Sequence, residues 1–136
     1  MNIKNNNRGF SLLELITAFS ILGLVTIALL QAFPFGLAAN REAENNSVAS
    51  YLAQQKIEEL GSVAYSDIEV GIIEPKNSVV THPGFQRQSE VSYVDGNMTE
   101  IASDLGLKKI STTIYYTSPQ SPAEKIYNLT TLVSKK

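Results

Sequence analysis

The sequence predicts an α+β fold in which one long N-terminal helix packs on a small antiparallel sheet of about three or four strands. Two patterns predict it. Residues 10–33 are almost wholly apolar, and residues 34–61 continue with apolar side chains three and four positions apart, which is the period of an α-helix. Residues 85–134 contain stretches in which apolar and polar side chains alternate, as in half-buried strands. With 136 residues, the chain is long enough for one domain with a modest core.

The first element is an apolar stretch from Phe10 to Leu30, in which Glu14 is the one ionisable side chain. A helix of this length spans roughly 30 Å, which is the thickness of the hydrocarbon core of a bilayer. Lys4 and Arg8 precede the stretch, and no acidic residue lies among them. The positive-inside rule therefore places the first residues in the cytoplasm and everything after Leu30 on the outer side, with the N-terminus in and the C-terminus out.

Three interpretations of this stretch are open. A secretory signal peptide would have an apolar region of about 7–15 residues and a cleavage site, and would release a β-rich binding domain that starts near Asn40. An uncleaved signal anchor would hold an extracytoplasmic binding or sensor domain on a single membrane span. This second interpretation leaves Glu14 unexplained, because a carboxylate inside a bilayer is costly and usually marks a function or a partner.

The third interpretation depends on the residues in front of the acid. The stretch RGFSLLE contains Arg8, then Gly9 and Phe10, and Glu14 is the fifth residue counted from Phe10. It resembles the class III signal of type IV prepilins and of type II secretion pseudopilins. The resemblance implies that a prepilin peptidase cuts between Gly9 and Phe10 and methylates the amine of Phe10. It also implies that Glu14 is the acid required for filament assembly.

Charge gives this arrangement a physical reason. The cut removes Lys4 and Arg8 and creates a cationic amine at the start of the apolar helix. An opposite charge within about 4–6 Å favours the ionised form of a carboxylate, so Glu14 gains a partner in its own chain or in a neighbouring subunit. Since an unpaired charge is far more costly than a paired one among apolar helices, the pairing can set the axial register between subunits.

The second part of the helix follows Pro34 and Gly36, which we expect to interrupt the helical pattern. The helix after them is amphipathic, and Gly61 is placed to end it. Its apolar face comprises Ala49, Leu52, Ala53, Ile57 and Leu60. The stretch NSVASYLAQQKIEEL is similar to the corresponding helix of minor pilins of the V type and of minor type II secretion pseudopilins of the I type.

Residues 62–136 are predicted to form the sheet. Three strands are expected in FQRQSEVSYVD, LKKISTTIYYT and EKIYNLTTLVS, with a turn at Asp95-Gly96-Asn97 and another at Ser118–Pro122. In the second strand one face carries Ile110, Thr112, Ile114 and Tyr116, and in the third one face carries Tyr127, Leu129, Thr131 and Val133. Residues 62–84 are expected to be an irregular connector with one edge strand at most.

The sequence contains few candidate residues for catalysis or for metal binding. The chain has no cysteine and a single histidine, His82, which lies in a loop flanked by Pro83 and Gly84 and is expected to be solvated. No phosphate loop or dinucleotide fingerprint is present, so we expect no cofactor and no metal. A formal net charge of −2 gives no strong signal for nucleic-acid binding.

Taken with the resemblance, these patterns predict a minor pilin or pseudopilin, which is a structural subunit and not an enzyme. Residues 1–9 would be the leader, 10–33 the transmembrane or filament-core helix, 34–61 the amphipathic half of the helix and 62–136 the β-rich globular part. The partners implied by the resemblance are prepilin peptidase, other pilin or pseudopilin subunits, and the inner-membrane assembly platform with its ATPase. The implied location is the bacterial inner membrane, followed by the pilus or pseudopilus.

Overall fold

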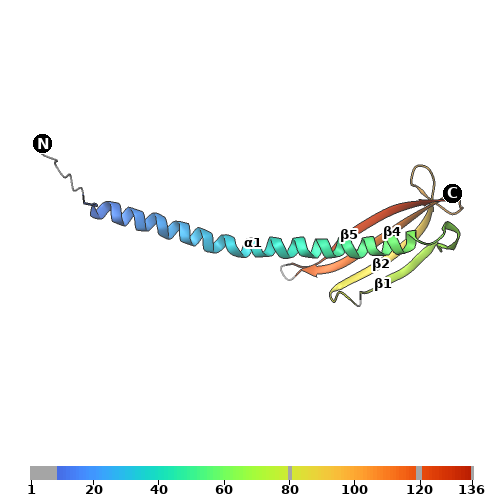
Figure 1. Cartoon of the computed structure of the whole chain (residues 1–136), viewed down its shortest axis with the longest axis horizontal. Helices are drawn as coiled ribbons and strands as arrows, with labels where there is room; N and C mark the ends of the chain where they lie inside the picture. The colour runs from blue at the N-terminus through green and yellow to red at the C-terminus, as the bar shows by residue number, and fades with distance from the viewer. Residues whose placement is uncertain (1–8, 80, 119–120, 136) are drawn as a thin grey trace, which may run out of the picture. The chain divides into compact units, whose positions relative to one another are not determined.

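The computed structural model describes residues 9–79, 81–118 and 121–135. Residues 1–8 of the predicted leader, with Lys4 and Arg8, lie outside the described residues, and so do residues 119–120 of the predicted turn. A short 3₁₀ turn at Tyr65–Asp67 follows the helix. The helix and the strands are α1 (Leu12–Gly61), β1 (Gly71–Ser78), β2 (Phe85–Val94), β3 (Glu100–Ile101), β4 (Leu107–Ser118) and β5 (Ser121–Ser134). The single N-terminal helix and the antiparallel sheet confirm the predicted α+β fold (Figure 1).

The helix α1 is continuous through Pro34, so the expectation that Pro34 and Gly36 interrupt it is wrong. Proline removes one intrahelical hydrogen bond, but the bonds of the flanking turns remain. Apolar helices tolerate proline when neighbouring groups satisfy the freed backbone atoms. The predicted end is confirmed, because α1 ends at Gly61.

The chain divides into two compact units, and the division falls between Asn40 and Arg41, inside α1. The second unit therefore contains the last turns of α1 together with the whole sheet. The main strands have the order β1-β2-β4-β5, and every neighbouring pair is antiparallel (Figure 1). The edge strand β1 accounts for the one strand allowed in the connector, and it contains Pro75 and two register shifts.

The predicted faces of the strands are confirmed. In β4 every second residue is buried, including Ile110, Thr112, Ile114 and Tyr116. The turn at Asp95 is confirmed too, since the Asp95 carboxylate accepts hydrogen bonds of 2.9 Å from the backbone N–H groups of Asn97 and Thr99. No sequence pattern predicted β3, which pairs with the last residues of β2. Only two residues long, β3 is too short to show an alternating pattern.

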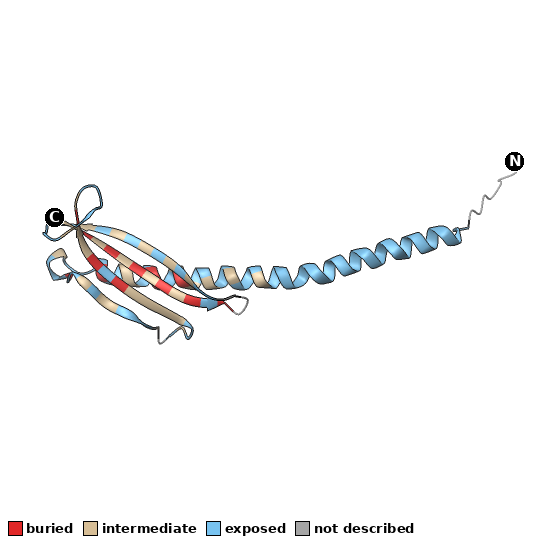
Figure 2. Cartoon of the chain, turned by 180° about the vertical axis from the view of Figure 1, so that it is seen from behind, coloured by how far each residue is buried: buried red, intermediate tan, exposed pale blue. Residues whose placement is uncertain are grey.

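Residues 41–61 of α1 cover one face of the sheet, and the buried residues of the unit lie between the two layers (Figure 2). One part of the core contains Ala49, Leu52, Ala53, Ile114 and Tyr116. The other contains Leu60, Ile68, Val91 and Ile110, with Ile57 partly buried against them. The apolar face predicted for the helix is therefore the face that meets the sheet.

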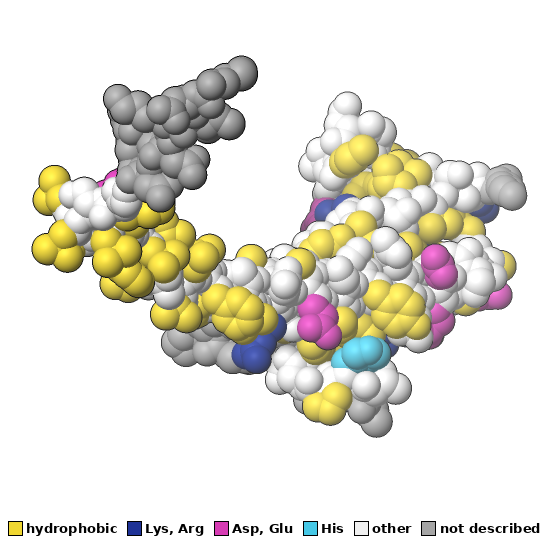
Figure 3. Space-filling model, turned by 60° about the vertical axis from the view of Figure 1, so that its left-hand side comes forward, with side chains coloured by type: hydrophobic (Ala, Val, Ile, Leu, Met, Phe, Trp, Pro, Cys, Tyr) yellow, Lys and Arg dark blue, Asp and Glu magenta, His cyan; other side chains and the backbone are white. Residues whose placement is uncertain are grey.

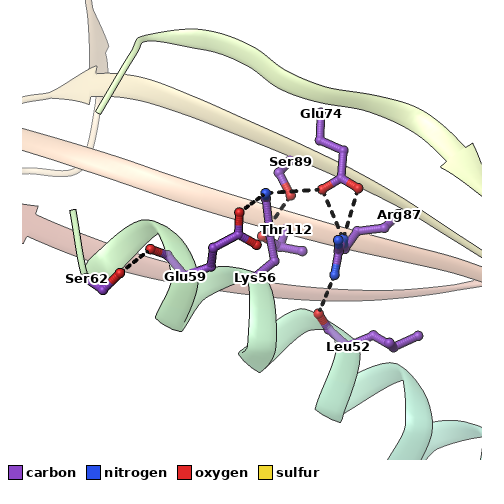
Figure 4. A network of polar contacts seen from close by, with 8 residues as sticks. All are labelled: Leu52, Lys56, Glu59, Ser62, Glu74, Arg87, Ser89 and Thr112. Carbon is purple, nitrogen blue, oxygen red and sulfur yellow. Dashed lines mark hydrogen bonds and ion pairs between the residues drawn. The ribbon is translucent and has the colours of Figure 1, made fainter. Parts of the chain in front are cut away.

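A group of charged side chains joins this part of α1 to β1 and β2 (Figure 4). The Glu74 carboxylate of β1 lies 3.0 Å from Arg87 Nε of β2 and 3.8 Å from Lys56 Nζ of α1. Arg87 also donates a hydrogen bond of 3.3 Å to the carbonyl of Leu52. Because all three side chains are largely shielded from solvent, they hold the irregular β1 strand against the helix and against β2.

Truncation of Leu52 tests the contact between the helix and the sheet. Leu52 is fully buried, so Leu52→Ala should lower the free energy of unfolding by about 2–5 kcal/mol through lost apolar burial and the cavity left behind. Denaturant unfolding of the full chain in detergent micelles measures it. Gln55→Ala, an exposed position on the same helix, should change stability by less than about 0.5 kcal/mol. Equal losses in the two variants would contradict the assigned packing.

Candidate functional site: the N-terminal apolar helix

The predicted cleavage site lies in an exposed, non-helical segment. Gly9 and Phe10 precede the helix, and the Phe10 side chain is 84% exposed. The carbonyl of Ser11 accepts the backbone N–H of Leu15 at 3.1 Å, which places Ser11 at the N-cap. The Gly9–Phe10 bond is therefore outside the regular hydrogen-bonded helix, where a protease can reach a peptide bond most easily.

Glu14 lies in the first turn of α1. The N-terminus of a helix carries a partial positive charge from its unsatisfied N–H groups, so an acid in the first turn is stabilising. Within the described residues no side chain forms an ion pair with Glu14; the ion pairs there join residues of the globular unit. Glu14 follows Phe10 by about one turn, so its carboxylate lies at the N-terminal end of the helix. Cleavage after Gly9 would create the new amine at this same end.

The helix exposes its apolar side chains in every direction. The large apolar residues from Phe10 to Leu37 are all exposed, between 47% for Leu37 and 84% for Phe10. Hydrophobic side chains cover this segment in the space-filling view (Figure 3). A helix that is apolar all round is stable when lipid or other helices surround it. Residues 9–79, 81–118 and 121–135 contain one helix, α1, that is long and apolar enough to cross a membrane.

Three hydroxyl groups of this segment form hydrogen bonds to the backbone of the helix itself. Thr17 Oγ1 donates to the carbonyl of Glu14 at 2.9 Å, and Ser20 and Thr26 donate to carbonyls four residues earlier at 2.8 Å. In a hydrocarbon environment an unpaired hydroxyl is costly, and bonding back to the backbone removes that cost. Glu14 is the one ionisable side chain of the segment, and a carboxylate in hydrocarbon needs a partner from elsewhere.

A second polar cluster lies at one end of the sheet. The ammonium of Lys108 is buried and donates hydrogen bonds of 2.7 Å to the carbonyls of Tyr65 and Ile68. It also lies 4.3 Å from the centre of the Tyr65 ring. Lys108 thereby fixes the connector after α1 to β4. A cavity of about 400 Å³ adjoins the cluster, lined by Tyr65, Ser66, Tyr93, Asp104, Lys108 and Lys135.

The Tyr65 hydroxyl donates a hydrogen bond to the Asp104 carboxylate. This bond, with a second one from the backbone N–H of Gly106, lowers the pKa of Asp104 below its usual range. Partial burial together with the Asp104 charge raises the pKa of Tyr65 to about 12. The pair is therefore held as neutral tyrosine and ionised aspartate near neutral pH.

The described residues contain no group of three or more His, Asp or Glu side chains that could hold a metal ion. His82 is half-buried, and its ring lies 6.4 Å from that of Tyr51 and 6.5 Å from that of Phe85. The histidine is thus less solvated than the sequence predicted, because the loop folds against the aromatic end of the core.

A comparison with protein families identifies a motif in the N-terminal segment. Residues 4–30 match the family model of the prokaryotic N-terminal methylation motif. The chain carries the prepilin signal of a type IV pilin-like protein. No curated protein and no solved structure matches the chain.

The prepilin signal contains Gly9, Phe10 and Glu14, and the structure places all three at the start of α1. No sequence pattern predicted a role for Lys108 or for the group of Lys56, Glu74 and Arg87. One signal could have found Lys108: it has the same parity in β4 as the core residue Ile110. The partners of Glu74 had no such signal, because the two register shifts in β1 hide their alignment.

Loss of the Tyr65 hydroxyl tests the second cluster. The pKa of Asp104 is lower in the folded state than its ordinary value of about 3.9, so the ionised carboxylate stabilises the fold above that pH. This stabilisation is lost as the pH falls through the pKa of the folded state. In Tyr65→Phe the pKa of Asp104 should rise towards its ordinary value and the protein should unfold at a higher pH on acidification. Carboxyl NMR titration measures the first effect and circular dichroism the second. Tyr51→Phe, at an exposed tyrosine, is the control, and an unchanged Asp104 pKa in Tyr65→Phe would contradict the assignment.

Proposed function

We propose that the protein is a minor pilin or minor pseudopilin, a non-enzymatic structural subunit of a type IV pilus or of a type II secretion pseudopilus. Prepilin peptidase cuts it between Gly9 and Phe10 and methylates the amine of Phe10. The apolar part of α1 then joins the helices of other subunits in the filament. The observation that carries this proposal is the methylation motif at residues 4–30, which supports a pilin-like protein.

The exposed apolar surface of α1 supports the proposal. Every large apolar side chain from Phe10 to Leu37 is exposed, so this part of α1 needs a membrane or other helices around it. Residues 41–61 by contrast are already packed on the sheet. In this proposal, the exposed apolar part of α1 serves assembly and residues 41–61 belong to the globular unit. A filament subunit requires both parts.

The motif and the apolar helix both indicate membrane anchoring. In the proposed sequence of events, the subunit enters the bacterial inner membrane with its N-terminus in the cytoplasm and its C-terminus outside. An assembly platform with its ATPase then moves it from the membrane into the filament. The similarity of residues 46–60 to minor pilins of the V type and minor pseudopilins of the I type favours a minor subunit.

Mass spectrometry of the mature N-terminus tests the cleavage step. Protein purified from a host with prepilin peptidase should begin at Phe10 and be one methyl group heavier than the unmodified chain from Phe10. In Gly9→Leu, which changes the residue before the bond, the chain should retain residues 1–9. Protein from a host without the peptidase is the matched control. A native protein that begins at Met1 would instead indicate an uncleaved signal anchor that carries a binding or sensor domain.

Substitution of Glu14 tests the assembly step. Glu14→Ala should be cleaved and methylated normally but should be incorporated into filaments at least about a hundredfold less. The reason is that an amine left without its partner in an apolar helix bundle costs about 3–5 kcal/mol. Immunoblots of sheared filaments, normalised to the membrane pool, measure incorporation. Thr17→Ala, one turn away on the same helix, should assemble normally, and normal assembly of Glu14→Ala would remove the basis for this role.

A further inference from the structure

The cavity of about 400 Å³ next to Lys108 lies at the end of the sheet where β5 ends (Figure 1). Its lining comes from the connector after α1, from β2, from the loop before β4, from β4 itself and from the residue that follows β5. These segments are far apart in the sequence and meet only in the folded unit. The volume lies within the range of roughly 300–1,000 Å³ that is typical of small-molecule sites.

Lys108 is a buried cation without a full counter-charge in contact. Its side chain is 3% exposed, and its ammonium donates hydrogen bonds to two neutral backbone carbonyls, those of Tyr65 and Ile68. The rings of Tyr65 and Tyr93 lie 4.3 and 5.6 Å from the same nitrogen. Within the part of the chain that the structure describes, the ion pairs do not include Lys108. Since buried charges are normally paired, this cavity favours an anion.

The charged groups of the lining leave one positive charge in excess. They are the ammonium groups of Lys108 and Lys135 and the carboxylate of Asp104. The single carboxylate balances one of the two cations. A ligand with one negative charge, such as a carboxylate, neutralises the remaining charge, whereas a phosphate dianion would leave a negative excess. The lining therefore fits a monovalent carboxylate better than a phosphate.

The other groups of the lining fit a hydroxylated ring. The Asp104 carboxylate accepts hydrogen bonds from the Tyr65 hydroxyl and from the backbone N–H of Gly106. An ionised carboxylate has about four acceptor sites, so Asp104 can accept further hydroxyl groups. Ser66 donates its hydroxyl to Asp67 at 2.9 Å and keeps its oxygen as an acceptor. The tyrosine rings supply apolar surface beside these acceptors.

We propose that this cavity binds an acidic sugar of one ring, a hexuronate. Its carboxylate lies against Lys108 and Lys135, and its hydroxyl groups donate to Asp104 and Ser66. Asp104 and Lys135 are exposed, so the ligand enters from solvent. The backbone N–H of Lys135 donates to the carbonyl of Gly106 at 2.8 Å, which holds this lysine at the cavity. The binding site goes beyond the proposed filament role, and it does not depend on leader cleavage or on Glu14.

Titration with sodium glucuronate, followed by NMR, tests the site. The full chain is held in micelles of a polyoxyethylene detergent, which has no sugar or charged headgroup. The backbone amides of Gly106 and Lys135 should shift and saturate with glucuronate. Glucose lacks the carboxylate, cyclohexanecarboxylate lacks the hydroxyls, and inorganic phosphate is the dianion, so each should bind at least about tenfold more weakly. No saturable shift with glucuronate, or equal affinity for any of the three other probes, would overturn the proposal.

Lysine variants separate the two cations of the cavity from a neighbouring lysine. Lys135→Gln should weaken glucuronate binding by about tenfold, because it removes the excess charge without changing a buried side chain. Lys108→Gln should abolish binding. Lys109→Gln is the matched control, since Lys109 is the next residue of β4, points to the other face and pairs with Glu100 at 2.6 Å.

The variant of Lys135 decides the outcome if Lys108→Gln does not fold, because Lys108 also holds the connector after α1. Circular dichroism of each variant shows whether it is folded. Unchanged glucuronate binding in folded Lys135→Gln would overturn the proposal. Equal weakening in Lys109→Gln would overturn it as well, because the loss would then follow the net charge of the protein and not the cavity.

Discussion

The structure depends on one constraint: the apolar surface of α1 between Phe10 and Leu37 has no cover within the described chain. The core of the globular unit is complete without this surface, because residues 41–61 already fill the space against the sheet. Exposure of the first part of the helix to water is therefore unfavourable, and lipid or other helices are the favourable environment for it. The methylation motif at residues 4–30 is consistent with both surroundings in turn.

The same constraint bears on the role proposed for Glu14. The hydroxyls of Thr17, Ser20 and Thr26 are bonded to the helix backbone, so they add no demand for a partner. The carboxylate of Glu14 is different, because a charge among apolar side chains is stable only beside an opposite charge. In the proposed filament, this one acid would restrict how neighbouring helices can be placed along their axes. Apolar packing alone does not impose such a restriction.

Much of the fold could be predicted from the sequence because its long elements have strong periods. The apolar face of the helix and the alternation of β4 each repeat over several residues, so Leu52 and Ile114 were correctly placed in the core. The strand β3 was missed because it is too short to have a period. The interruption expected at Pro34 was wrong, since one proline removes a single hydrogen bond from a helix of 50 residues.

The site residues Gly9, Phe10 and Glu14 could be predicted because they form a short motif of neighbouring residues, and the roles given to them are proposals. The contacts of Lys108 and Glu74 depend on residues far away in the chain, which no local pattern encodes.

The presence of Pro34 inside α1 has a consequence for the neighbours of this helix. Proline has no N–H, so the carbonyl of Leu30, one turn earlier, receives no bond from residue 34. This carbonyl is a hydrogen-bond acceptor at a fixed position on a largely apolar surface, one residue before the polar Gln31. A water molecule, or a hydroxyl from an adjacent helix, can bind there and mark one side of the rod at a defined height.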